Sequence, residues 1–501
     1  MGAGPRAGSF PVAPPGRTSP TEVPGDTIWP VLGVVLAVWR RLCALPAVVQ
    51  DAWLYVASAV FAGATAFVAV SSDYRTWGEM AAAAYGAAAL VCFGVARAVA
   101  RSTGRDPVRA ARFASVSRRV VVVAVIAGAV LVPLVFQLVW RAEGLPGQHA
   151  QPEVAVVERA GDRAAASHDP YLTHPTTVGN APRSDAKHVD ANSFFPYLPG
   201  MVPFGLVNAV KLPPELQDAR VALTGFTLVV GAVALLWSDA SLARRGRALQ
   251  FLVVLPSGAL PMVTGGDDLP VLALMLLGLV LAERRRPVLA GIALGLSGTL
   301  KFTAWPMLLL MVLAVRDREG RPAPFRYGLA LLLVVTPVLG LGVALDPTSF
   351  FDNVVRFPLG LAKVRSPAAS PMVGQVLTHL LPQHRLAVTA LLVLVGAAVV
   401  AAAFLRHRPR TPAGVARFTG FAMALATVLA PATRFGYFIY PANLFVWAYV
   451  LDGMSAARRS GGQSASSISN TVSDTVLVGV APPSAGVMEA ATGRTTTAAS
   501  Q

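Results

Sequence analysis

Long apolar segments recur from residue 52 to residue 451, and they constrain the fold more than any other feature of this chain. A helix needs about 20 mostly apolar residues to cross the hydrocarbon core of a bilayer. The 501-residue chain is 54% hydrophobic and only 14% charged, whereas an ordinary soluble protein carries about 25% charged residues. The pattern therefore predicts an all-α, polytopic membrane protein.

Clusters of arginine follow every second apolar segment, and cytoplasmic loops of membrane proteins are rich in Lys and Arg. The link at 101–119 contains six arginines, so we expect it in the cytoplasm. The next span, 120–140, would then run outward. Continuing this alternation predicts about twelve transmembrane helices, at 52–70, 80–98, 120–140, 222–237, 251–263, 269–282, 288–300, 305–315, 327–345, 386–405, 418–429 and 437–451.

The net charge of +16 follows from these arginine-rich loops. No nucleic-acid-binding motif or basic amphipathic helix accompanies the charge, so we do not expect nucleic acid as a partner. Cys43 and Cys92 both fall in apolar surroundings without the spacing of a metal or redox site, which indicates ordinary packing.

The longest polar segment, 151–200, is the first candidate for chemistry, because it follows the outward span and so lies outside. Its histidines are too irregularly spaced for a structural zinc site. Its aromatic residues can stack on sugar rings, although an interfacial aromatic belt explains them nearly as well. The candidate site residues in this segment are Glu153, Asp169, Tyr171, Asp190 and Tyr197.

Further ionisable residues fall at the same predicted face: Asp267, Asp268, Lys301 and Arg434. A single charge near the end of a span usually snorkels to the interface. Charges of both signs at one level of several spans instead favour a shared site. Basic groups on the outer face call for an anionic partner such as a phosphate. The adjacent acids at 267–268 either bind a divalent cation or serve as the N-cap and first-turn charge of a helix.

The order of these motifs resembles a known family. An outward span is followed by an early carboxylate, Asp-Pro-Tyr at 169–171 and an aromatic–proline segment. Gly-Gly-Asp-Asp-Leu-Pro at 265–270, a small-residue helix ending at Lys301, and Pro-Ala-Thr-Arg-Phe-Gly-Tyr at 431–437 come next. This order resembles the GT-C superfamily of membrane glycosyltransferases, specifically the bacterial polyprenyl-phosphate-mannose-dependent mannosyltransferases of glycosyltransferase family 87. The resemblance extends over residues 120–451.

The resemblance implies that a sugar, mannose in this family, passes from a polyprenyl phosphate to an acceptor hydroxyl at the extracytoplasmic face of a bacterial membrane. Glu153 matches the general base, although the family usually carries Asp there, and Asp169 and Asp190 remain alternatives. Lys301 and Arg434 match basic residues near the donor phosphate. The remaining expected donor or substrate contacts are Tyr171, Asp190, Tyr197, Asp267, Asp268 and Tyr437.

The partners implied are the lipid-linked donor, membrane lipid, and a glycolipid, polysaccharide or protein acceptor. No cofactor is expected, with a divalent cation as the alternative. The chain divides into a disordered cytoplasmic tail at 1–27, a membrane segment of an interfacial helix and two spans at 28–119, a GT-C-like catalytic domain at 120–455 and a second disordered tail at 456–501.

Two other classes compete with an enzyme. A multi-pass transporter would show inverted repeats and polar residues at the bilayer midplane, and the chain shows no convincing repeat. A scaffold without catalysis would not need acidic and basic groups to converge at one face.

Overall fold

The computed structural model describes residues 44–456, with gaps at 105, 172–176, 179–180, 183–190, 359–367 and 369. The predicted tails and the predicted interfacial helix at 28–39 lie outside these residues, apart from residue 456. The described chain is almost wholly helical. Its strands are β1 (Thr177–Val178) and β2 (Ala181–Pro182), which pair antiparallel. The predicted all-α fold class is confirmed.

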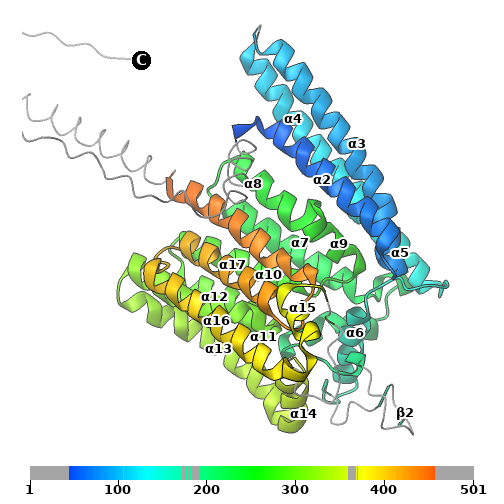
Figure 1. The fold of residues 1–501 in the computed structure, drawn as a ribbon, viewed down its shortest axis with the longest axis vertical. Helices are drawn as coiled ribbons and strands as arrows, with labels where there is room; N and C mark the ends of the chain where they lie inside the picture. The colour runs from blue at the N-terminus through cyan, green and yellow to red at the C-terminus, as the bar shows by residue number, and fades with distance from the viewer. Residues whose placement is uncertain are drawn as a thin grey trace, which may run out of the picture.

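Two long helices, α2 (Ala47–Val68) and α3 (Ser72–Ser102), form an N-terminal hairpin along one side of the molecule (Figure 1). The two helices approach closely at Gly78, where any side chain would collide with the backbone of Ala62 and Ala66. Small residues of this kind are typical of tightly packed helix pairs in membranes.

Buried polar groups join this hairpin to the rest of the bundle. The indole nitrogen of Trp77 donates to the carbonyl of Ala129 at 3.0 Å, and the hydroxyl of Tyr85 donates to the carbonyl of Val254 at 2.6 Å. Both carbonyls lie in π-helical turns, which leave backbone oxygens without their usual partner. The hairpin is therefore packed into the same unit as the helices that follow it.

The first outward helix is longer than predicted. α4 (Pro107–Ile126), the π-helical η1 (Ala127–Leu131) and α5 (Val132–Ala142) follow one another without a break, so the helix starts at residue 107 rather than 120. Asp106 caps this start by accepting a hydrogen bond from the backbone of Arg109. Arginine is itself a good helix former, so the basic link does not end the helix.

The centre of the bundle is α10 (Asp268–Glu283), which packs against α7 (Ala219–Trp237) and α11 (Pro287–Leu300) and is buried along nearly its whole length. α10 and α11 are joined by a short turn and run antiparallel, so the start of α10 lies beside the end of α11. The other long elements are α8 (Leu242–Leu249), η5 (Gln250–Val254), α9 (Pro256–Thr264), α12 (Trp305–Glu319), α13 (Pro322–Leu345), α16 (Arg385–Arg406), α17 (Pro412–Leu429) and a helix at 439–456.

Within the described residues, eight helices are long and apolar enough to cross a membrane. The other four predicted spans coincide with α10, α11, α12 and the helix at 439–456, which are shorter or less apolar. A short helix buried among others does not need to match the bilayer thickness by itself. The polytopic architecture is confirmed, and the number twelve stays a prediction.

The polar segment at 151–200 begins as a helix and not as a loop. α6 (Pro152–Ala165) buries Val154, Val157 and Ala160 against η3 (Pro199–Ala209), and the backbones meet where Gly161 faces Gly205. Apolar residues spaced by three and four along an otherwise polar sequence produce this one-sided helix.

Short elements gather at the end of the bundle where α10 begins. Figure 1 shows α6, α14 and α15 at this end and α8 toward the other. Arginine-rich links meet at the opposite end, where Arg318 pairs with Glu283 at 2.6 Å. The short elements and the arginine-rich links therefore lie at different ends of the bundle. The short elements, besides α6 and η3, are η2 (Ala191–Ser193), η4 (Pro214–Leu216), η6 (Phe302–Ala304), α14 (Pro347–Phe351), η7 (Asp352–Arg356), α15 (Val373–Leu380), η8 (Pro382–His384) and η9 (Phe435–Phe438).

Candidate active site

Lys301 lies between two carboxylates at the start of α10. Its ammonium nitrogen is 2.8 Å from Asp267 Oδ2 and 2.6 Å from Asp268 Oδ1. The hydroxyl of Tyr440 also donates to Asp268 Oδ1, at 2.6 Å. The three charged residues come together because the start of α10 and the end of α11 are neighbours in the antiparallel pair.

Lys301 remains charged in this arrangement. Burial alone would lower the pKa of Lys301, but the carboxylates of Asp267 and Asp268 raise it above its usual range, so the ammonium stays charged. Its nitrogen also lies 4.9 Å from the centre of the Tyr197 ring, within cation–π range. The ammonium occupies the space between the carboxylates that a divalent cation would need. The cation alternative stays a prediction.

Glu153 and Arg434 form a second ion pair at the same end of the bundle. Glu153 lies in the first turn of α6, and Arg434 lies in the extended segment just before η9. Burial alone would lower the pKa of Arg434, and the neighbouring Glu153 carboxylate more than offsets this. Among the described residues, Arg434 makes its side-chain contact through Nη1, so its remaining N–H groups stay available.

The two ion pairs belong to one site. The backbone N–H of Gln151, two residues before Glu153, donates at 2.8 Å to the carbonyl of Thr264, three residues before Asp267. Tyr197 lies against Lys301, and the backbone N–H of Tyr437 donates to the carbonyl of Arg434 at 3.1 Å. The structure therefore brings together seven of the residues predicted from sequence, namely Glu153, Tyr197, Asp267, Asp268, Lys301, Arg434 and Tyr437.

Asp169, the rival candidate for the base, lies apart from this cluster. Its carboxylate accepts a hydrogen bond from the backbone N–H of Tyr171 at 3.0 Å, and its carbonyl accepts one from Arg163 at 2.6 Å. Burial raises the pKa of Asp169. In the described part of the chain it forms no ion pair with either basic residue of the site, so its contacts are those of a turn.

Tyr171 is a core residue rather than a residue of the site surface. It is completely buried, packs against Phe195 and Phe350, and donates its hydroxyl to the carbonyl of Tyr197 at 2.9 Å. It therefore fixes the backbone that carries Tyr197 and has no surface left for a sugar. Asp190 lies outside the described residues.

Sequence reasoning missed three residues of the site: Tyr74, Gln151 and Tyr440. Tyr440 follows Tyr437 by three residues, and side chains at this spacing share one face of a helix, so the helical pattern could have revealed it. Tyr74 and Gln151 carry no such signal, because they reach the site only through the packing of the N-terminal hairpin.

The family model of glycosyltransferase family 87 matches residues 196–431. Residues 196–431 therefore carry the sequence pattern of that family. The match confirms the resemblance predicted from the motifs and favours an enzyme over a transporter or a scaffold. It includes Tyr197, Asp267, Asp268 and Lys301, whereas Glu153 precedes it and Arg434 follows it.

Two crystal structures of ArnT from Cupriavidus metallidurans are similar to the chain. The form bound to undecaprenyl phosphate is 15% identical with a TM-score of 0.39, covering 66% of this chain and 60% of that chain. The apo form is 16% identical with a TM-score of 0.37, covering 62% and 56%. The chain thus spans about 60% of the ArnT chain bound to undecaprenyl phosphate. No curated protein gives a significant match.

Proposed function

We propose that this family 87 enzyme transfers a hexosyl group, mannosyl by its resemblance, from a polyprenyl phosphate to an acceptor hydroxyl. The reaction takes place at the extracytoplasmic face of a bacterial membrane. Two features support this: the family match, and a site at the end of the bundle opposite the arginine-rich links. The acceptor class stays open among a glycolipid, a polysaccharide and a protein.

The observation that carries the proposal is the ion pair between Glu153 and Arg434. An arriving phosphate competes with Glu153 for Arg434, because guanidinium binds phosphate oxygens in a bidentate fork. The exchange of partners frees the Glu153 carboxylate at the moment the donor is bound. The pair therefore couples donor binding to the release of a general base.

The chemistry then needs one proton acceptor and one stabilised leaving group. Glu153 accepts the proton of the acceptor hydroxyl while the oxygen of that hydroxyl forms a bond to the anomeric carbon. The bond from that carbon to the phosphate oxygen breaks, and its electron pair leaves with the polyprenyl phosphate. Arg434 contacts the phosphate, and Lys301 adds positive charge nearby. Asp267, Asp268, Tyr197 and Tyr437 would offer hydrogen-bonding groups to the sugar.

Transfer from defined donors tests the function. Purified enzyme in lipid vesicles is incubated with radiolabelled polyprenyl-phosphate mannose or polyprenyl-phosphate glucose, together with a membrane extract as acceptor source. We expect label to move to a product from the lipid-linked donor, with the glucose donor measuring sugar selectivity. Label transfer from a nucleotide sugar in the absence of any polyprenyl phosphate would contradict the proposal.

The face of the membrane can be tested by cysteine labelling. In a background with Cys43 and Cys92 replaced by serine, single cysteines are introduced at two exposed positions, Glu143, directly after α5, and Arg286, in the turn between α10 and α11. We expect a membrane-impermeant maleimide to label E143C in intact cells and R286C only after permeabilisation. The reverse pattern would put the site on the cytoplasmic face.

A further inference from the structure

The hairpin formed by α2 and α3 precedes the family 87 segment, and nothing so far assigns it a role. The first turn of α3 contacts the α5–α6 loop, residues 143–151. The hydroxyl of Ser72 donates to the carbonyl of Gln148 at 2.7 Å and accepts from the backbone N–H of the same residue at 2.7 Å. Gly147 comes so close to Ser72 that a side chain there would lie 3.1 Å from its hydroxyl. The hairpin thus binds the backbone of this loop through the side chain of Ser72.

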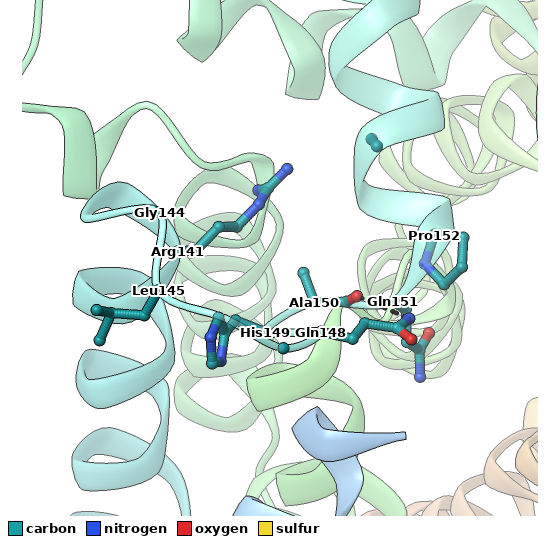
Figure 2. A pocket seen from close by; sticks show the side chains of 10 residues that line it. Arg141, Gly144, Leu145, Gln148, His149, Ala150, Gln151 and Pro152 are labelled. Carbon is teal, nitrogen blue, oxygen red and sulfur yellow. Dashed lines mark hydrogen bonds between the residues drawn. The ribbon is translucent and has the colours of Figure 1, made fainter. Parts of the chain in front are cut away.

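A second contact lies at the end of the loop, where Gln151 precedes the first turn of α6. The side-chain amide of Gln151 donates to the hydroxyl of Tyr74 and, at 3.0 Å, to the hydroxyl of Thr264. Its backbone N–H donates to the carbonyl of Thr264 at 2.8 Å. Figure 2 shows Gln148 and Gln151 on this loop, along a pocket that it helps to line, with the blue ribbon of the N-terminal hairpin below.

Gln151 therefore joins three parts of the site. It is two residues before Glu153, it contacts Tyr74 of the hairpin, and Thr264 ends α9 three residues before Asp267. A shift of the hairpin would consequently move the start of α6 relative to Arg434.

We propose that the first turn of α3 is a clamp that positions Glu153, with Tyr74 as its positioning residue. The inference rests on the role proposed above for Glu153. General-base catalysis needs the carboxylate within hydrogen-bond reach of the acceptor hydroxyl. A displacement of about 1 Å can lower a rate by about 10²-fold, so a segment that holds the first turn of α6 controls turnover without touching substrate.

The test compares two Tyr-to-Phe changes on the same helix. Tyr74→Phe removes the hydroxyl that accepts from Gln151, whereas Tyr85→Phe removes a buried hydroxyl that donates to Val254, away from the site. We expect Y74F to lower kcat about tenfold, the effect of one hydrogen bond, with the KM values for donor and acceptor unchanged. Y85F lowers the melting temperature and keeps its kcat.

A double-mutant cycle separates positioning from a general loss of structure. Gln151→Leu removes the contacts to both Tyr74 and Thr264, so its kcat falls further than that of Y74F. If the clamp acts through the contact between Tyr74 and Gln151, the double variant Y74F/Q151L turns over as slowly as Q151L alone. Additive losses in kcat would mean that the two residues act independently, and would overturn the clamp.

The outcomes also separate this inference from the proposed function. A normal kcat for Y74F beside an inactive Glu153→Gln refutes the clamp and leaves Glu153 as the base. A normal kcat for Glu153→Gln refutes the assignment of the base, and the clamp, which acts through Glu153, is then refuted with it.

Discussion

Replacing Glu153 with glutamine is expected to lower the turnover number by about 10²–10⁴-fold, the usual contribution of general acid–base catalysis. Glutamine keeps the size and hydrogen bonding of the side chain but cannot take up the proton of the hydroxyl group that receives the sugar. Its amide oxygen still faces Arg434, which Glu153 contacts in the structure, so donor binding should persist. The measurement is kcat with labelled donor, together with the donor KM.

Three further substitutions make this result specific. Glu153→Asp keeps the carboxylate and should retain part of the activity. Glu143→Gln removes an exposed carboxylate from the neighbouring α5–α6 loop and should turn over normally. Asp169→Asn should affect folding more than kcat, because its carboxylate holds a turn. If E153Q turned over at a near-normal rate while D169N was inactive, Asp169 would be identified as the base.

Replacing Arg434 with alanine is expected to lower kcat/KM for the donor by about 10²–10³-fold, the usual loss when a group that stabilises developing negative charge is removed. In the described residues only Nη1 of Arg434 makes a side-chain contact, to Glu153, so a phosphate can bind the rest of its fork first and then displace the carboxylate. Arg434→Lys keeps the positive charge but loses the bidentate guanidinium. Its kcat/KM for the donor should lie between the values of the unchanged enzyme and of R434A. Steady-state kinetics with varied donor, and inhibition by free polyprenyl phosphate, measure the effect.

The matched control for Arg434 is Arg417→Lys. Arg417 also pairs with a carboxylate, that of Asp452 at 2.7 Å, but this pair is half exposed at the arginine-rich end of the bundle. An exposed pair of this kind contributes about 0–1 kcal/mol, so R417K should keep both its kinetics and its melting temperature. An unchanged donor KM and kcat for R434A would show that Arg434 does not contact the phosphate.

Much of the site could be predicted from sequence because each charged residue stands out within its own apolar segment. Lys301 ends a helix of small residues, and Asp267 and Asp268 interrupt an apolar run, so these charges are conspicuous in the sequence. Their pairing could not be predicted in the same way. The contacts of Lys301 with the two carboxylates depend on how α10 and α11 pack, and its contact with the Tyr197 ring depends on how the segment before η3 packs against them.

The sequence alone determined the class of protein and the end of the bundle where the charges collect. Both follow from hydrophobic run length and from the position of arginine, which are local properties that a bilayer converts directly into helices and their orientation. The sequence did not predict that the 151–200 segment begins with a helix, because the apolar face of α6 is short. Only the tertiary structure shows that this face packs against η3.

Only the tertiary structure decided which carboxylate meets which cation. Glu153 and Arg434 are 281 positions apart, and Asp169, only sixteen residues beyond Glu153, instead accepts a hydrogen bond from the backbone of Tyr171. Tyr74 reaches the site from a hairpin that precedes the family 87 segment. A charge can be read from one position in the chain, but the distance between two charges is set by the packing of every helix between them.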